Sequence, residues 1–342
     1  MPIKKLFAMV FALLLAGQIF ATDVVLNPEH PDQYVVVKGD TLWDISAMFL
    51  RDPWLWPEIW YVNPQIDNPH LIYPGDLLTL VYINGKPQLR LSRGGDQRLS
   101  PRMRVENLDN AIPTIPLDAI KQFLTRTIVV DENELATAPY VLQSADEHVI
   151  SGAGDRVYVR GIENKDYAQF DIFEPGDTYV DPDTDEVLGY AALYIGSGPV
   201  QHFGDPATIL LTETTREVRA GYRLRPSDTP DPTLHFQPRP TPPGTEGHII
   251  SVIGGVTQIG QFNVVAIDLG TREGMEIGHV MRVFQQGEVI RDRFSDKRID
   301  KVKLPDEDAG LVMIFRTYEK VSFGLVMTAT RAMHIHDYVR TP

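Results

Sequence analysis

The four tryptophans of this 342-residue chain all lie between residues 34 and 83. Large aromatic side chains bury much apolar surface, so a short segment that holds every tryptophan can close a small core of its own. The chain has no cysteine, and its cores must therefore hold without disulfides. We predict a compact domain that contains Trp43, Trp54, Trp56 and Trp60.

The first half of this segment predicts a strand and then a helix. The β-branched run 34–37 favours a strand, and residues 38–39 turn the chain. Asp40 or Thr41 then caps a helix, because T-L-W-D fits a capping box. Three apolar side chains at helical spacing face inward from it: Leu42, Ile45 and Phe49.

The second half predicts another helix and another strand. Pro53 ends the first helix, and Pro57 fits the first turn of the second, which Asn63-Pro64 stops. Pro74-Gly75 then turns the chain into a strand over residues 77–82. The predicted order is β-α-α-β.

Two signatures in this segment carry a family resemblance. Y-V-V-V-K-G-D-T-L-W-D-I-S and W-Y-V-N-P-Q-I-D-N-P-H-L-I-Y-P-G-D-L-L-T-L stand in the order and at the spacing of the LysM domain, which the segment resembles closely. LysM domains bind chitin-like and peptidoglycan glycans through N-acetylglucosamine. The stretch 50–57 is longer and more aromatic than in a minimal LysM domain, so Trp54 and Trp56 could stack on sugar, dock a partner, or cover the core.

The resemblance implies a shallow groove between two loops, one before the first helix and one before the second strand. An acetamido group needs a donor, an acceptor and an apolar seat, which loop backbone groups and the side chains of Leu42, Ile66 and Leu71 can supply. Gly39 and Asp40 also serve the turn and the cap, and Leu42 also suits the core. The implied walls are Gly39, Asp40, Thr41 and Leu42 on one side and Ile66, Asp67, Asn68, Pro69, His70 and Leu71 on the other.

The rest of the chain predicts a linker, a short helical lead-in and a β region. Residues 84–112 are polar and rich in Gly and Arg, which is typical of a linker. Residues 117–124 and 131–136 have helical patterns within a first unit that spans 113–225. Strands are expected at 156–160, 190–194, 208–213, 264–267 and 311–316.

A proline-rich stretch, residues 226–246, divides the β region in two and predicts an extended spacer. The halves on either side repeat one order: a strand, a strand–turn–strand hairpin, a Gly-led strand, and a last strand before Arg-x-Pro. We interpret this as duplication of a small β-barrel-like unit, with chance likeness as the alternative. The fold class is therefore α+β: a β-α-α-β LysM module, a short helical segment and a mainly β region of two barrel-like repeats, the second over 247–342.

The N-terminus predicts export. Lys4 and Lys5 precede an apolar stretch, 6–16, that is short for a membrane span, and cleavage after Ala21 would remove residues 1–21 as a signal peptide. The alternative is an uncleaved anchor helix. We expect a periplasmic, wall-associated protein with no membrane span after cleavage. The net charge of −14 disfavours nucleic acid and anionic membranes as partners.

Known wall-hydrolase sites do not fit the sequence. The chain has no thiol nucleophile, and His334-Ile335-His336 lacks the upstream H-x-x-x-D of lysostaphin-type zinc peptidases, which favours a surface strand. Gly196-Ser197-Gly198 lacks the context of a nucleophile elbow, and the acidic turn 181–186 suits a solvated hairpin tip better than a calcium loop. A carboxylate pair for glycosidase chemistry stays open. We expect no catalytic site, no metal and no cofactor.

The whole architecture resembles the TsaP-like family of LysM proteins, which associate with type IV pilus secretins and have an FlgT-like C-terminal region. This resemblance implies a protein that anchors an outer-membrane secretin, or another envelope protein, to peptidoglycan, with several copies arranged as a ring-forming homo-oligomer. The alternatives are a general LysM scaffold or regulator of wall enzymes, and a peptidoglycan hydrolase with an unrecognised site.

Overall fold

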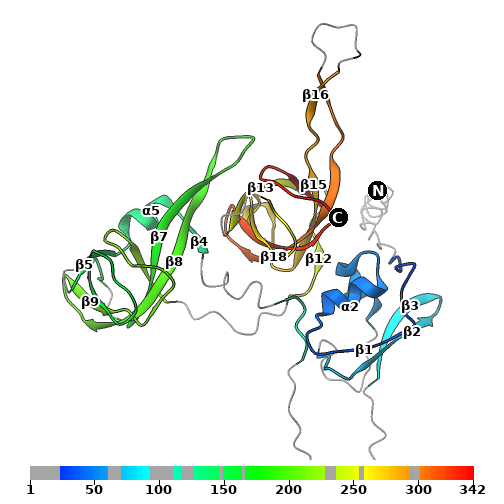
Figure 1. The fold of residues 1–342 in the computed structure, drawn as a ribbon, viewed down its shortest axis with the longest axis horizontal. Coiled ribbons are helices and arrows are strands. Elements are labelled where there is room, and N and C mark those ends of the chain that lie inside the picture. Colours follow the sequence, from blue (N-terminus) through cyan, green and yellow to red (C-terminus); the bar gives the residue numbers. More distant parts are fainter. Residues whose placement is uncertain are drawn as a thin grey trace, which may run out of the picture. The chain divides into compact units, whose positions relative to one another are not determined.

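The computed structural model divides the chain into two units, residues 1–112 and residues 113–342 (Figure 1). Each unit is considered by itself. The structure describes residues 24–60, 71–92, 111–116, 127–145, 149–163, 166–227, 236–253, 258–292, 294 and 301–342. The predicted signal peptide and the predicted helix over 117–124 lie outside these ranges. None of the described helices is both long enough and apolar enough to cross a membrane.

The first unit has the predicted β-α-α-β order with one more strand. Strand β2 (Leu77–Ile83) lies between β1 (Gln33–Val35) and β3 (Lys86–Ser92) in an antiparallel sheet. Between β1 and β2 come helix α2 (Leu42–Phe49), a 3₁₀ turn η1 (Pro53–Leu55) and helix α3 (Trp56–Ile59).

Strand β3 corrects the expected linker at its start. Residues 84–85 form the tight turn of the β2–β3 hairpin, with positive φ at both Asn84 and Gly85. Leu89 and Leu91 of β3 are buried, so this strand completes the core of the module. Residues 86–92 are poor in glycine and alternate polar with apolar side chains, a pattern that could have predicted the strand. The Arg-rich stretch that follows obscured this pattern.

The second unit contains two β-barrels. In the first, six strands close a ring in the order β5–β6–β9–β8–β7–β11, with β11 paired back to β5. The strands are β5 (Tyr140–Ser144), β6 (Arg156–Arg160), β7 (Gln169–Val180), β8 (Val187–His202), β9 (Ala207–Leu210) and β11 (Arg223–Pro226). Helix α5 (Glu132–Thr137) precedes them and agrees with the predicted second helical pattern.

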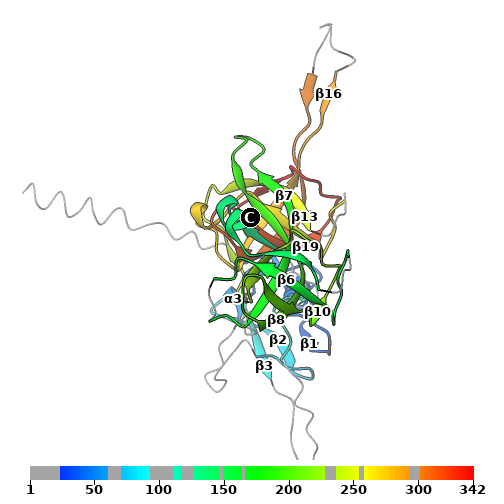
Figure 2. The same cartoon turned by 90° about the vertical axis from the view of Figure 1, so that its left-hand side faces the viewer.

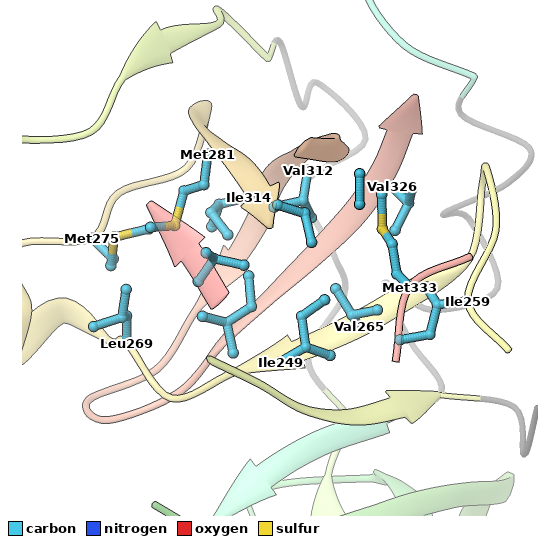
Figure 3. Packing of buried hydrophobic residues seen from close by; sticks show 14 residues of the cluster. Ile249, Ile259, Val265, Leu269, Met275, Met281, Val312, Ile314, Val326 and Met333 are labelled. Atoms are coloured by element: carbon cyan, nitrogen blue, oxygen red, sulfur yellow. The ribbon is translucent and has the colours of Figure 1, made fainter. Parts of the chain in front are cut away.

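The second barrel closes in the order β13–β14–β19–β18–β15–β20, with β20 paired back to β13. The strands are β13 (Glu246–Ile253), β14 (Val264–Ile267), β15 (His279–Gln285), β18 (Glu307–Thr317), β19 (Ser322–Ala329) and β20 (Tyr338–Arg340). Met281, Ile314 and Val326 belong to its fully buried core (Figure 3).

The two rings have the same topology and follow one another along the chain. Taken in sequence order, the six strands of either ring follow one another around the barrel in the order first, second, fifth, fourth, third, sixth. Even the turn before the last strand agrees, because Gly221 and His336 both have positive φ there. The predicted duplicated β-barrel architecture is thus confirmed in its topology.

Short strands extend both barrels. β4 (Thr127–Val130) and β10 (Glu213–Thr214) pair with β8, while β12 (Arg239–Pro240) pairs in parallel with β15. Strand β12 and the buried Phe236 lie within the predicted spacer 226–246, so the second half of that stretch packs on the second barrel. Proline is compatible with β12 because it is an edge strand.

A separate two-stranded ribbon, β16 (Val289–Arg291) and β17 (Lys301–Lys303), continues the β15–β18 hairpin beyond the barrel. It projects away from the second barrel in both views (Figures 1 and 2).

The long β7–β8 hairpin of the first barrel contacts the second barrel. The ring of Tyr179 meets that of Phe323 edge to face, with centroids 6.5 Å apart. At the tip, the Glu186 carboxylate accepts hydrogen bonds from Arg272 Nη1 at 3.0 Å and Lys320 Nζ at 2.7 Å. The hydrogen bond from Arg272, and after it the one from Lys320, lower the pKa of Glu186 to about 2. The acidic turn is therefore a docked hairpin tip.

This docking contact gives a titration that can be tested. A carboxyl whose pKa is lowered stabilises the folded contact above its ordinary pKa of 4.5, and this stabilisation is lost as the pH falls toward 2. We expect carbon-detected NMR to place the Glu186 midpoint near 2 and Arg272→Gln to raise it toward 4.5. Arg331→Gln, which removes an exposed arginine paired with Glu307, is the control and should leave the midpoint in place. An unchanged midpoint in Arg272→Gln would contradict the contact.

Candidate glycan-binding site

The loop before α2 is held by the carboxylate of Asp40. Its Oδ2 accepts hydrogen bonds from the Val37 backbone N–H and from the Tyr34 hydroxyl, each at 2.9 Å. Gly39 lies inside this turn at φ +102°, a conformation that glycine adopts without strain and other residues rarely adopt. The side chain of Asp40 therefore shapes the loop from within.

Of the two predicted cap residues, Asp40 and Thr41, it is Thr41 that caps the helix. Its Oγ1 accepts a hydrogen bond from the Asp44 backbone N–H at 3.1 Å and donates to the Asp44 carboxylate at 2.8 Å. Leu42, the first helical residue, is only 3% exposed and belongs to the core. The sequence suggested three apolar side chains as contacts for the acetamido group, and the one from Leu42 lies inside the core of the module.

The second implied wall is described at one residue. Ile66, Asp67, Asn68, Pro69 and His70 lie outside the described residues, whereas Leu71 is half-buried at the end of that loop. The next residue, Ile72, is buried, and its carbonyl accepts a hydrogen bond from the Ile112 backbone N–H at 2.8 Å. Sequence analysis did not anticipate this return of the chain at Ile112, because it joins residues 40 positions apart.

Backbone hydrogen bonds tie the ends of the two loops together. The turn 73–76 follows the second loop, and Val36 precedes the first. The Gly75 N–H donates to the Val36 carbonyl at 2.8 Å, and the Val36 N–H donates to the Asp76 carbonyl at 2.9 Å. Asp76 Oδ2 also accepts from the Tyr73 N–H at 3.0 Å, which stabilises this turn. The chain before the first loop and the turn after the second loop are thus joined at Val36.

Three of the four tryptophans are buried in the core of the module, and the fourth is partly accessible. Trp43, Trp54 and Trp56 are buried, so the extra aromatic stretch fills the core of the module. Trp60 is half-buried, meets Trp56 edge to face with ring centroids 5.9 Å apart, and bridges Leu89 of β3. Of the three roles left open for Trp54 and Trp56, both side chains have that of covering the core.

The histidines that suggested metal chemistry lie in the second barrel. His334 and His336 lie in the turn before β20, not on a strand, because the chain reverses there around Asp337. The His334 Nδ1 atom is 3.9 Å from Asp337 Oδ2. Within the described ranges, no group of three or more His, Asp or Glu residues is placed to hold a metal ion.

Comparison with known protein families gives a match to the segment that forms this site. Residues 34–81 match the LysM domain. The chain carries a LysM domain. The structural module is larger than the match, since β3 and Ile112 pack on it beyond residue 81.

The chain also resembles one curated protein over a short stretch. The chain is 40% identical over 60 residues to YqbP, an uncharacterized protein of Bacillus subtilis (strain 168). This match covers 15% of the chain and 27% of the relative, so it concerns a domain and not the whole protein. A LysM domain implies peptidoglycan binding and association with the cell wall.

The Asp40 contacts can be tested through Tyr34. Burial first, and then the hydrogen bond with Asp40 and its charge, raise the pKa of the Tyr34 hydroxyl. We expect Asp40→Asn to lower this pKa toward 10, because the negative charge is removed, and to cost about 1 kcal/mol of stability. NMR titration of Tyr34 and urea unfolding would measure the two effects. The exposed Asp32→Asn is the control, and equal shifts in both variants would contradict the assignment.

Proposed function

We propose that this protein is a non-catalytic envelope protein that binds peptidoglycan through its LysM module and holds a partner assembly through its β-barrels. The carrying observation is that the segment matching the LysM domain joins the strand before its first loop to the turn after its second loop, through backbone hydrogen bonds of Val36 with Gly75 and Asp76.

Within the groove, we assign the polar contacts with an N-acetylglucosamine unit to loop backbone groups. The side chains of Asp40 and Thr41 are already engaged in the turn and the helix cap, which supports this assignment. Leu71 is half-buried and can seat the acetamido methyl. A site of this size buries few ligand atoms, so one module binds weakly and several copies bind the wall much more strongly.

For the partner, we propose an outer-membrane secretin of the type IV pilus. The support is the resemblance of the whole architecture to secretin-associated LysM proteins, together with two barrels that each extend a hairpin. A general wall scaffold or regulator of wall enzymes would use the same module with another partner. The absence of a cysteine nucleophile in the sequence supports a non-catalytic role, and a sacculus zymogram of the purified protein should show no clearing.

Wall binding is tested with isolated sacculi. We expect the purified protein to sediment with sacculi and a chain without residues 24–112 to stay in the supernatant, because the first unit is removed whole. Leu71→Ala should reduce the bound fraction several-fold. Tyr82→Ala, at an exposed position at the far end of β2, is the matched control and should bind normally. Full retention of the chain without the first unit would contradict the function.

The partner is tested by crosslinking in cells. A photoreactive residue at exposed Val149, on the first barrel, or at exposed Phe294, beyond β16, should capture the secretin. The same residue at Lys86, on the LysM module, is the control and should not. Repeated capture of a different envelope protein would favour the general scaffold.

A further inference from the structure

The tip of the β7–β8 hairpin meets a histidine of the second barrel as well as the two cations that bind Glu186. Oδ2 of Asp183, in the turn at the tip, lies 3.9 Å from Nε2 of His248 in β13. His248 is buried, whereas the side chain of Asp183 is 75% exposed. The contact therefore joins a buried imidazole to a carboxylate that reaches it from the first barrel.

A buried carboxylate holds the other side of this imidazole. Oδ1 of Asp268, the residue after β14, accepts a hydrogen bond from the His248 backbone N–H at 2.6 Å, and its Oδ2 lies 2.9 Å from His248 Nδ1. When Asp268 is ionised it accepts a hydrogen bond from Nδ1–H, so Nε2 is the nitrogen that can gain a second proton. This nitrogen is the one closer to Asp183.

Three carboxylates surround the imidazole. Oδ1 of Asp181 accepts hydrogen bonds from the backbone N–H groups of Asp183 and Thr184, at 2.8 and 2.9 Å, which fixes the turn. Burial raises the pKa of the Asp268 carboxyl most, and the charge of Asp181 raises it further. With a neutral His248 the site therefore has an excess of negative charge, and a proton on the imidazole would offset it.

The remaining charged groups near His248 on the second barrel have partners of their own. Glu246, on the same strand, accepts a hydrogen bond from Arg340 Nε of β20 at 2.8 Å. On β20 the ring of Tyr338 lies against the imidazole, with centroids 4.8 Å apart. In the turn before β20, the Asp337 carboxylate accepts hydrogen bonds from two backbone N–H groups.

The other charged groups of the tip behave differently with pH. Asp185 is exposed, and Glu186 binds Arg272 and Lys320. Arginine and lysine side chains keep their charge at physiological pH, and the pKa of Glu186 is lowered to about 2, by the hydrogen bond from Arg272 first. An imidazole, in contrast, changes its charge between about pH 5 and 8. The tip thus has one contact whose charge varies near neutral pH beside others whose charge is constant.

We propose that His248 is a pH-sensitive switch that holds the β7–β8 tip on the second barrel more tightly when its imidazole is protonated. The protonated Nε2–H attracts Asp183 and offsets the charges of Asp181 and Asp268. The contact is then strongest at acid pH, and it weakens as the pH rises through the range in which histidine loses its proton. This inference depends neither on wall binding nor on the partner protein.

The test measures docking of the two barrels against pH. The sequence has no cysteine, so spin labels attach only at introduced ones, at the exposed Ala220 of the first barrel and the exposed Ala332 of the second. Electron spin resonance gives the fraction of molecules with the docked distance, and urea is added until docked and undocked molecules coexist. We expect the docking constant to increase roughly threefold from about pH 8 to about pH 5.5, as for a partly exposed ion pair.

Two variants assign the response to the proposed pair. His248→Gln is neutral at every pH and should remove the increase. Asp183→Asn leaves the buried pair of His248 and Asp268 intact and should retain only the weaker effect of Asp181, so it decides the matter if the first variant folds poorly. A double-mutant cycle on His248 and Asp183 should show coupling at acid pH and none at alkaline pH.

Controls use the same tip and the same barrel. A cycle with Glu186→Gln and Arg272→Gln should give equal coupling at both pH values, because both side chains stay charged. His336→Asn removes an exposed histidine at a positive φ that asparagine tolerates, and it should keep the full response. A docking constant that does not increase toward acid pH, or an increase that survives undiminished in His248→Gln or in Asp183→Asn, would overturn the proposal.

Discussion

Closure of the six-stranded rings is the constraint on which the β region depends. In each barrel the sixth strand pairs back to the first, so each ring strand has a partner on both sides. A closed ring has no free edge at which another chain could add a strand. Contacts with other molecules must then come from loops and from strands that run past the ring, and both barrels extend the hairpin between their third and fourth strands.

Charged side chains hold the first of these extensions in place. The first hairpin brings Glu186 to Arg272 and Lys320, and the resulting hydrogen bonds hold its pKa well below the ordinary carboxyl value. Both partners are partly exposed, so the contact gains specificity more than stability. The aromatic contact of Tyr179 with Phe323, where Tyr179 is buried, supplies the apolar part.

The LysM module must form a stable core from a short segment of chain. It has few residues and no disulfide, so three buried tryptophans and the additional strand β3 complete its core. Its first loop is held by the Asp40 carboxylate, and backbone hydrogen bonds of Val36 join this loop to the turn 73–76. The polar side chains of Asp40 and Thr41 hold the turn and the helix cap. Backbone groups and Leu71 therefore remain as the proposed sugar contacts.

The sequence by itself determined the parts whose signals are local. A strand that includes Tyr34 and Val35, a helix cap at Asp40 or Thr41, the helix after it and the repeated strand order of the β region follow from spacing, capping and turn residues within a few positions of each other. The LysM assignment was equally accessible, because both signatures are continuous stretches of sequence.

Only the tertiary structure decided which distant segments meet. Ring closure, the placement of β3 and Ile112 on the LysM module, the burial of Trp54 and Trp56, and the Glu186 contacts join residues far apart in the chain. Periodicity reports which face of an element is apolar and does not report what covers that face. The partner of each face is fixed by packing and hydrogen bonding in three dimensions, which a linear pattern does not contain.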